Sequence, residues 1–392
     1  MSDDEIEYDA LAFGIVRNGS YTSHPDFLLP LYSPAPLSPT AFRPPGWPFI
    51  LSIIYALFGH SVICARIILG VLGAIGAVCV FLIAMEVNLT FREAVVAGTI
   101  WALWPASVCH INTASIRLYS ESLLVPVLLW TFLMLMYTVR SRSVLISMIA
   151  GAMLGFCLLI RVNYIPLAVA AILWCVARWR QNDRNKSWLV GVALSLSIAI
   201  LPAIWGTRNY HTLGTFAVAT QADILFFGNN AWTRGSQNTA MASQQFEHLD
   251  DRYPGFLYKS EVEKSRIYRS EAWAYVMSNK RHMIWVLWRK ILILMSPVHE
   301  TPGGYAYSFA YILMIPFFLL GVGCRIYHRD ITSCLLLIPL ATAIVTAMVV
   351  FGHPRYRYPA EPFMVILAIF GGRYLLFKFQ VLFPRKQALA EW

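Results

Sequence analysis

Charged side chains are scarce in this chain. Asp, Glu, Lys and Arg make up 13% of its 392 residues, whereas 58% of the residues are hydrophobic. A soluble domain carries about a quarter charged residues, so the composition excludes an ordinary soluble protein. Several apolar segments also reach the roughly 20 residues that a helix needs to cross a bilayer. The sequence therefore predicts an all-α polytopic membrane protein.

Patterns typical of several other protein classes are also lacking. The seven cysteines form no CxxC pair and lie within or at the ends of apolar segments, which argues against a disulfide framework or a zinc site. No Gly-rich phosphate loop or Rossmann pattern occurs, so a soluble nucleotide donor is not expected. The net charge of +10 is expected to mark cytoplasmic loops, and we predict no nucleic-acid partner.

The apolar segments divide the chain into four regions. Residues 1–61 are expected to hold an extracytoplasmic acidic motif and a juxtamembrane segment, and residues 62–205 the first transmembrane helices. Residues 206–304 read as an extracytoplasmic loop with an interfacial helix, and residues 305–392 as the last transmembrane helices and a cytoplasmic tail. The expected spans are Val62–Ala84, Ala94–Ile111, Leu118–Val139, Val144–Ile160, Ile165–Trp179, Trp188–Trp205, Tyr305–Cys324, Ile331–Phe351 and Pro362–Phe379.

Lys and Arg in the short loops set the expected orientation. We place the N-terminus outside and let Ile284–Met295 lie along the membrane interface. Nine basic residues then fall in inside loops and four in outside loops, the bias expected for cytoplasmic loops. The inside set is Arg92, Arg140, Arg142, Arg178, Arg180, Arg184, Lys186, Arg325 and Arg329, and the outside set is Arg117, Arg161, Arg355 and Arg357.

Polar groups from five segments then fall on the outer face. Five acidic residues crowd into Ser2–Asp9 and are followed by a short helical pattern over Ala10–Val16. The other segments are Phe42–Pro48, Leu118–Ser122, the Gly228-Asn229-Asn230 stretch and His353–Pro359. The acids are either a solvated tail, as most terminal acidic runs are, or the reactive end of a cavity.

Together these pieces resemble the bacterial polyprenyl-phosphate-sugar glycosyltransferases. These are the protein-mannosyltransferase-like and aminoarabinose-transferase-like members of the GT-C superfamily. The similar stretches are Asp4-Glu5 with Tyr8, Pro44–Pro48, Arg161 after a span, Gly228–Asn230 and Arg355–Pro359. The resemblance covers nearly the whole chain and implies a GT-C-like transmembrane helix bundle with an extracytoplasmic loop region. In that family a transmembrane helix precedes the Asp-Glu pair, so we expect the first family helix to lie upstream of Met1.

The resemblance also implies a function. It indicates an enzyme of the bacterial inner membrane that moves a sugar from a polyprenyl-phosphate donor to a lipid, glycan or protein acceptor. Asp4 matches the family's catalytic acid and Glu5 its neighbour; a single catalytic carboxylate predicts inversion at the sugar. Guanidinium groups match phosphate oxygens, so Arg355, Arg357 and Arg161 are expected to bind the donor phosphate. The resemblance also places four residues in the expected acceptor cleft: Tyr8, Glu121, Asn229 and Asn230.

Each of these assignments has a simpler alternative. The Arg355 and Arg357 side chains could instead extend to lipid headgroups. Glu121 could have only a capping role at a helix N-terminus. A lipid-linked glycan transporter, or an O-antigen-type polymerase or ligase, would also be polytopic and cationic. The enzyme is favoured because the notable charges gather at one face and the sequence contains no internal repeat. The histidines show no metal-ligand spacing, and the sequence leaves a divalent-metal requirement open.

Overall fold

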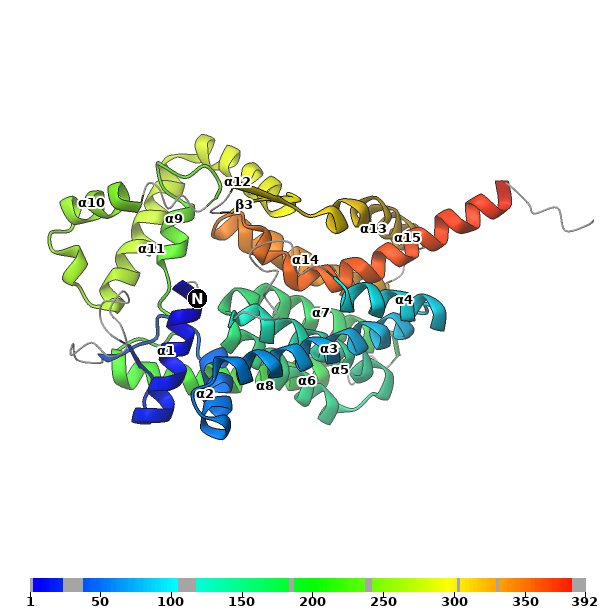
Figure 1. The fold of residues 1–392 in the computed structure, drawn as a ribbon, viewed down its shortest axis with the longest axis horizontal. Helices are drawn as coiled ribbons and strands as arrows, with labels where there is room; N and C mark the ends of the chain where they lie inside the picture. The colour runs from blue at the N-terminus through cyan, green and yellow to red at the C-terminus, as the bar shows by residue number, and fades with distance from the viewer. Residues whose placement is uncertain are drawn as a thin grey trace, which may run out of the picture.

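The computed structural model describes residues 3–23, 38–104, 118–182, 187–236, 242–301, 304–328 and 331–382. Within these residues the chain is mostly helical, with connecting loops and two short antiparallel strand pairs (Figure 1). The elements are α1 (Asp3–Asn18), β1 (Thr22–Ser23), β2 (Ser38–Pro39), α2 (Gly46–Phe58), α3 (Val62–Glu86), α4 (Phe91–Ala102), α5 (Ser120–Ser141), α6 (Val144–Ile160), η1 (Val162–Tyr164), α7 (Ile165–Asn182), α8 (Ser187–Leu213), α9 (Asp223–Gly228), α10 (Ala242–Arg252), η3 (Phe256–Tyr258), α11 (Glu261–Ser278), α12 (Lys280–Met295), β3 (Val298–Thr301), β4 (Gly304–Tyr307), α13 (Phe309–Tyr327), α14 (Ile331–Val349), η4 (Pro354–Tyr356), η5 (Tyr358–Ala360) and α15 (Glu361–Leu382).

Seven helices of the described residues are long and apolar enough to cross a membrane. They are α3, α5, α7 with η1, α8, α13, α14 and α15 with the turns before it. Two further apolar helices, α2 and α6, are shorter. The prediction of a multi-pass helical membrane protein is confirmed.

Several of the expected spans differ from the observed helices at their ends, and two of these differences have a clear local cause. The helix expected over Ala94–Ile111 begins earlier, at Phe91, because Thr90 and Glu93 form a capping box. It ends at Ala102, shortly before Pro105, and residues 105–111 lie outside the described residues. The span expected from Tyr305 begins instead at Phe309, because residues 304–307 pair with β3 as a hairpin.

The acidic stretch is itself helical. We expected a helix over Ala10–Val16, but α1 begins at Asp3 and includes the acids. Negative side chains are favourable near a helix N-terminus, and the chain leaves the helix through Gly19, whose φ is +63°. Residues three and four apart share a helix face, so Asp4, Glu7 and Tyr8 lie side by side on α1.

Glycines allow close helix packing in the bundle. A Cβ at Gly155 of α6 would lie 2.6 Å from the carbonyl oxygen of Ile198 in α8. A Cβ at Gly321 or Gly371 would lie 1.9 Å from a carbonyl oxygen of the partner helix in the α13–α15 pair. Small residues at such crossings let backbones approach, which is how helices associate in a membrane.

The segment between the two sets of spans forms a separate lobe, which we call the α9–α11 lobe. It has a small apolar core made by Ala222, Phe226, Leu249, Phe256 and Tyr268. Figure 1 shows this lobe at one end of the molecule, with α1 between it and the bundle of α3–α8. Helix α12 leads from the lobe back to α14, and the junction of lobe and bundle is where the site lies.

Candidate active site

A cavity of about 520 Å³ lies at this junction. Its walls come from α1, the segment before α2, the end of α6, the residues around the start of α9, α11 and the turn after α14. Charged and titratable side chains on its walls include Asp4, Glu7, Arg43, Arg161, Asp223, Arg269, His353 and Arg355. The acids of α1 and the predicted arginines Arg161 and Arg355 are therefore brought together from segments far apart in sequence.

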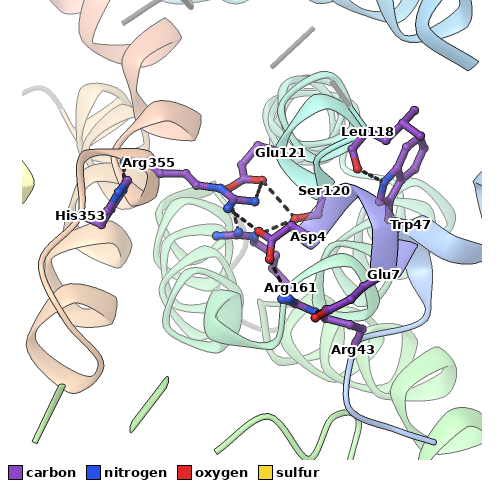
Figure 2. Close-up of polar contacts among 10 residues, drawn as sticks. All are labelled: Asp4, Glu7, Arg43, Trp47, Leu118, Ser120, Glu121, Arg161, His353 and Arg355. Atoms are coloured by element: carbon purple, nitrogen blue, oxygen red, sulfur yellow. Dashed lines mark hydrogen bonds and ion pairs between the residues drawn. The ribbon is translucent and has the colours of Figure 1, made fainter. Parts of the chain in front are cut away.

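Asp4 is held by two arginines. Arg43 Nη2 lies 2.7 Å from Asp4 Oδ1, and Arg355 Nη1 lies 2.5 Å from Asp4 Oδ2 (Figure 2). Burial raises the pKa of Asp4, but the guanidiniums of Arg43 and Arg355 lower it by more, so the pKa is held well below its usual range. Asp4 is thus a charged acceptor, with both oxygens engaged.

Glu121 is the second carboxylate of this network. It is buried in the first turn of α5. Arg161 Nη2 lies 2.7 Å from Glu121 Oε1, and Arg355 donates to both carboxylate oxygens, with Nη2 2.8 Å from Oε2. Arg355 therefore bridges Asp4 and Glu121, as Figure 2 shows. Buried charges need such pairing to be tolerated.

The turn after α14 aims Arg355 into the cavity. His353 Nδ1 accepts the backbone N–H of Arg355 at 3.0 Å, and Pro354 begins the short 3₁₀ turn η4. The guanidinium also lies over the ring of Tyr119, 4.3 Å from its centroid. The side chain is therefore fixed from both ends.

Arg43 is positioned by the Pro-Pro-Gly turn that follows it. A Cβ at Gly46 would lie 2.8 Å from Ile160 N, so only glycine lets α2 begin against the end of α6. Trp47 Nε1 donates to Leu118 O at 2.7 Å and fixes the other side of this turn (Figure 2). Arg43 then donates to Glu7, a residue that we did not single out from the sequence.

Glu5 lies outside the cavity. It is 1% exposed, accepts the backbone N–H of Leu118 at 3.0 Å and lies 3.7 Å from Arg66. Neighbouring helix positions point to different faces, so the structure separates Glu5 from Asp4. Glu5 joins α1 to the start of α5. Tyr8, in contrast, lines the cavity as expected.

Arg357 also lies away from the cluster. Its guanidinium is fully buried, donates to Glu361 Oε1 at 2.9 Å and to the carbonyl oxygens of Leu294 and Ser296, and lies over Tyr311. Two consecutive 3₁₀ turns send side chains two residues apart in different directions. Arg357 therefore ties this turn to the end of α12 and does not line the cavity.

Asn229 and Asn230 are buried and bind backbone groups. Asn229 donates to Leu225 O at 2.7 Å and Val349 O at 2.8 Å, and accepts from Lys290 Nζ at 2.9 Å. Asn230 donates to Phe226 O at 3.0 Å. Neither residue lines the cavity; they attach the lobe to the end of α14.

Two further charged residues of the cavity come from the lobe. Arg269 of α11 donates to Ser265 and faces the same space as Asp4. Asp223, the first residue of α9, lies on the cavity wall near Arg43. Sequence reasoning missed both because nothing in their spacing relates them to Asp4. Packing of the lobe against α1 brings them there.

A metal site was left open by the sequence. Among the residues that the structure describes, no group of three or more His, Cys, Asp and Glu side chains is placed to hold a metal ion. The cavity carboxylates Asp4 and Glu7 are instead bound by arginines. The chemistry that this arrangement offers is a negative acceptor next to fixed positive charges.

Comparison with known proteins agrees with this architecture. The family model for dolichyl-phosphate-mannose-protein mannosyltransferases matches residues 42–205. A crystal structure of the Archaeoglobus fulgidus oligosaccharyltransferase tethered to an acceptor peptide with the NVT sequon matches with a TM-score of 0.57 and 15% identity, over 98% of this chain and 47% of that one. The chain is therefore similar to GT-C glycosyltransferases in its fold and, over residues 42–205, in its sequence.

A second structure of the Archaeoglobus fulgidus oligosaccharyltransferase, in complex with Zn and sulfate, gives a similar result. Its TM-score is 0.54 at 16% identity, over 97% of this chain and 46% of that chain. The chain thus spans about half the length of the solved structures that it matches. No curated protein sequence matches it. The GT-C-like helical fold expected from the sequence is confirmed.

Proposed function

We propose that this protein is a membrane glycosyltransferase that moves a sugar from a polyprenyl-phosphate donor to a lipid, glycan or protein acceptor. The observation that carries the proposal is Asp4, a carboxylate held between Arg43 and Arg355 in a cavity at the end of a GT-C bundle. A base for the acceptor and cations for the leaving phosphate are the groups that this reaction needs.

The arginines suggest how the donor is bound. Arg355 and Arg161 face the cavity and share Glu121. A donor phosphate would compete for the Arg355 guanidinium, because charge-assisted bonds to phosphate are strong. As Arg355 turns from Asp4 to the phosphate, the pKa of Asp4 rises, and its carboxylate becomes a better base.

The reaction then follows as a direct displacement. The acceptor's nucleophilic atom attacks the anomeric carbon, while the bond from that carbon to the phosphate oxygen breaks. The acceptor's proton passes to Asp4, and the polyprenyl phosphate leaves with the bonding electrons, next to Arg355 and Arg161. One displacement inverts the configuration at the anomeric carbon.

An extracytoplasmic site in the bacterial inner membrane is part of the proposal. Helix α5 carries Glu121 at one end and Arg140 at the other, and its 22 residues span about 33 Å. At that far end Arg140 pairs with Glu86, and Arg325 donates to Val87 O. The positive-inside tendency favours this end as cytoplasmic. Arg117, Arg184, Lys186 and Arg329 of the sequence argument lie outside the described residues.

A donor panel tests the proposal. The protein in lipid nanodiscs is incubated with radiolabelled undecaprenyl-phosphate sugars and, in parallel, with GDP-mannose and UDP-glucose. Extracted membrane lipids, p-nitrophenyl α-mannoside and a serine peptide are supplied as acceptors. We expect label to leave one or more of the lipid-phosphate donors and none of the nucleotide sugars. Use of a nucleotide sugar, or no donor turnover at all, would overturn the proposal.

A further inference from the structure

Asp223 lies where two cavities meet. The cavity that contains Asp4 adjoins a second one of about 1020 Å³, walled by residues 38–42 and by the α9–α11 lobe. Five residues line both spaces: Phe42, Thr220, Ala222, Asp223 and Ser265. Among these five, only Asp223 has an ionisable side chain. A substrate that extends from one cavity to the other must therefore pass its carboxylate.

The Asp223 carboxylate is not fully engaged by the protein. Its Oδ1 atom is buried and has no hydrogen-bond partner among the described residues. Buried polar atoms of folded proteins are nearly always paired, and one without a partner calls for a role. The residue lines both cavities and is partly exposed, so a donor from a molecule bound there can approach its carboxylate.

The surroundings of Asp223 favour a protonation change near neutral pH. Burial raises its pKa to about 6, against the opposing charge of Arg43. Three ionisable groups interact with it directly: Glu7 of α1, Arg43, and Tyr268 of α11. The other acidic, basic and histidine side chains on the walls of the two cavities are Asp4, Arg161, Lys259, Glu261, Lys264, Arg269, His353 and Arg355.

The second cavity has the chemistry of a glycan site. Aromatic rings of Phe42, Phe227, Phe246, Tyr258 and Tyr268 line it. Its wall is fixed by Glu261, which accepts from Thr40, from the Ala41 N–H and from Thr220. Aromatic faces with a few polar groups between them bind molecules that present both apolar faces and hydroxyl groups, as sugar rings do.

We propose that Asp223 is the acceptor-binding carboxylate, and that a glycan acceptor in the second cavity donates a hydroxyl hydrogen bond to it. A neighbouring hydroxyl of the same glycan then reaches Asp4 in the first cavity. This inference rests on the proposed glycosyl transfer and narrows its acceptor to a glycan. It also predicts pH-dependent acceptor binding: Asp223 accepts a strong, charge-assisted hydrogen bond when ionised, above pH about 6, and only a weaker one once it is protonated at lower pH.

The test compares Asp223→Asn with the wild type in nanodiscs. The acceptor probe is p-nitrophenyl α-mannoside, and the donor is a lipid-phosphate sugar that the wild type turns over. We expect the acceptor KM of Asp223→Asn to rise at least tenfold at pH 7.5, with the donor KM unchanged and kcat within threefold. Its acceptor KM should no longer change between pH 5 and 8, whereas the wild-type value rises below pH 6.

Two variants control this comparison. Asp251→Asn removes an exposed carboxylate of α10 in the same lobe and should behave as the wild type. Asp223→Glu retains the carboxylate and should restore part of the affinity and the pH dependence. Equilibrium binding of the tritiated probe without donor gives the same comparison in the absence of turnover.

The outcomes separate the two proposals. Normal donor turnover with an unchanged acceptor KM in Asp223→Asn overturns the role of Asp223, as does an equal loss of donor and acceptor affinity. Transfer to a serine peptide but not to the mannoside overturns the glycan acceptor. If the wild type turns over no lipid-phosphate donor, the proposed function itself fails, and this inference fails with it.

Discussion

Arg355 shows at the scale of single residues how the site is assembled. It contacts Asp4 near the start of the chain and Glu121 at the start of α5, and it stacks on Tyr119. Arg357, only two residues later, is buried with Glu361. The same residue type therefore has two roles in one short turn: Arg355 faces the proposed donor, and Arg357 holds the fold.

Substitutions should separate these roles. Arg355→Lys loses the planar fork that can hold a carboxylate or phosphate with two bonds. We expect kcat/KM for the donor to fall by about tenfold or more, which is the typical effect of losing one charge-assisted hydrogen bond. The thermal midpoint should change little. Arg357→Met should instead leave the Glu361 carboxylate buried without its cation. We expect the free energy of unfolding to fall by about 3 kcal/mol or more, and the thermal midpoint to fall with it. Donor kinetics and thermal unfolding of both variants check this, and a reversed pattern would contradict the assignment.

Asp223 allows a stability prediction that needs no substrate. Its folded pKa of about 6 lies above the ordinary value of 3.8, so the native state binds more protons between those values. The stabilisation that comes from protonated Asp223 is therefore fully present below pH about 4 and is lost as the pH rises through 6. Asp223→Asn removes this loss. Its free energy of unfolding should exceed the wild-type value at pH 7.5 by about 1 kcal/mol once solvent access is allowed for, and the difference should shrink at pH 4. A constant difference across this range would show that Asp223 does not titrate in this way.

At the scale of elements, the helices were easier to predict than the contacts. Apolar length is a local property, so α3, α6 and α7 begin where the sequence indicates. Helix α1 begins earlier than the pattern over Ala10–Val16 predicts, because the acids before that pattern form the first turns of the helix. The roles of Glu5 and Asn229 depend on which face or backbone group each meets after packing. No spacing rule in one sequence contains that information.

Adjacent glycines of α15 test the close helix crossing. A Cβ at Gly371 would lie 1.9 Å from Phe317 O, whereas one at Gly372 would lie 3.9 Å from the Phe317 ring. Gly371→Val should therefore separate α13 from α15 and prevent accumulation of folded protein, since backbone atoms cannot move aside cheaply. Gly372→Val should accumulate normally. Size-exclusion profiles of the two variants in detergent measure this, and equal behaviour would contradict the crossing.

At the scale of the whole molecule, the site lies at one end of the bundle and the basic loops at the other. A cysteine-labelling experiment tests whether these ends face opposite sides of the membrane. Ser141 ends α5 at the basic end and is exposed, and Tyr258 in the α9–α11 lobe is 93% exposed. In a background with Cys334→Ser, Tyr258→Cys should react with an impermeant maleimide in intact cells, and Ser141→Cys should react only after lysis. The opposite pattern would place the site in the cytoplasm.

The central claim concerns Asp4, and turnover of Asp4→Asn tests it most directly. The substitution keeps the size of the side chain but removes the proton acceptor. Arg43 retains Glu7 and Arg355 retains Glu121, so the fold should persist. Glu5→Gln, outside the cavity, supplies the comparison and should affect thermal stability more than turnover per folded molecule. With one lipid-phosphate donor under saturating conditions, we expect kcat of Asp4→Asn to fall by roughly 100-fold or more. Turnover equal to that of the wild type would contradict the catalytic role of Asp4.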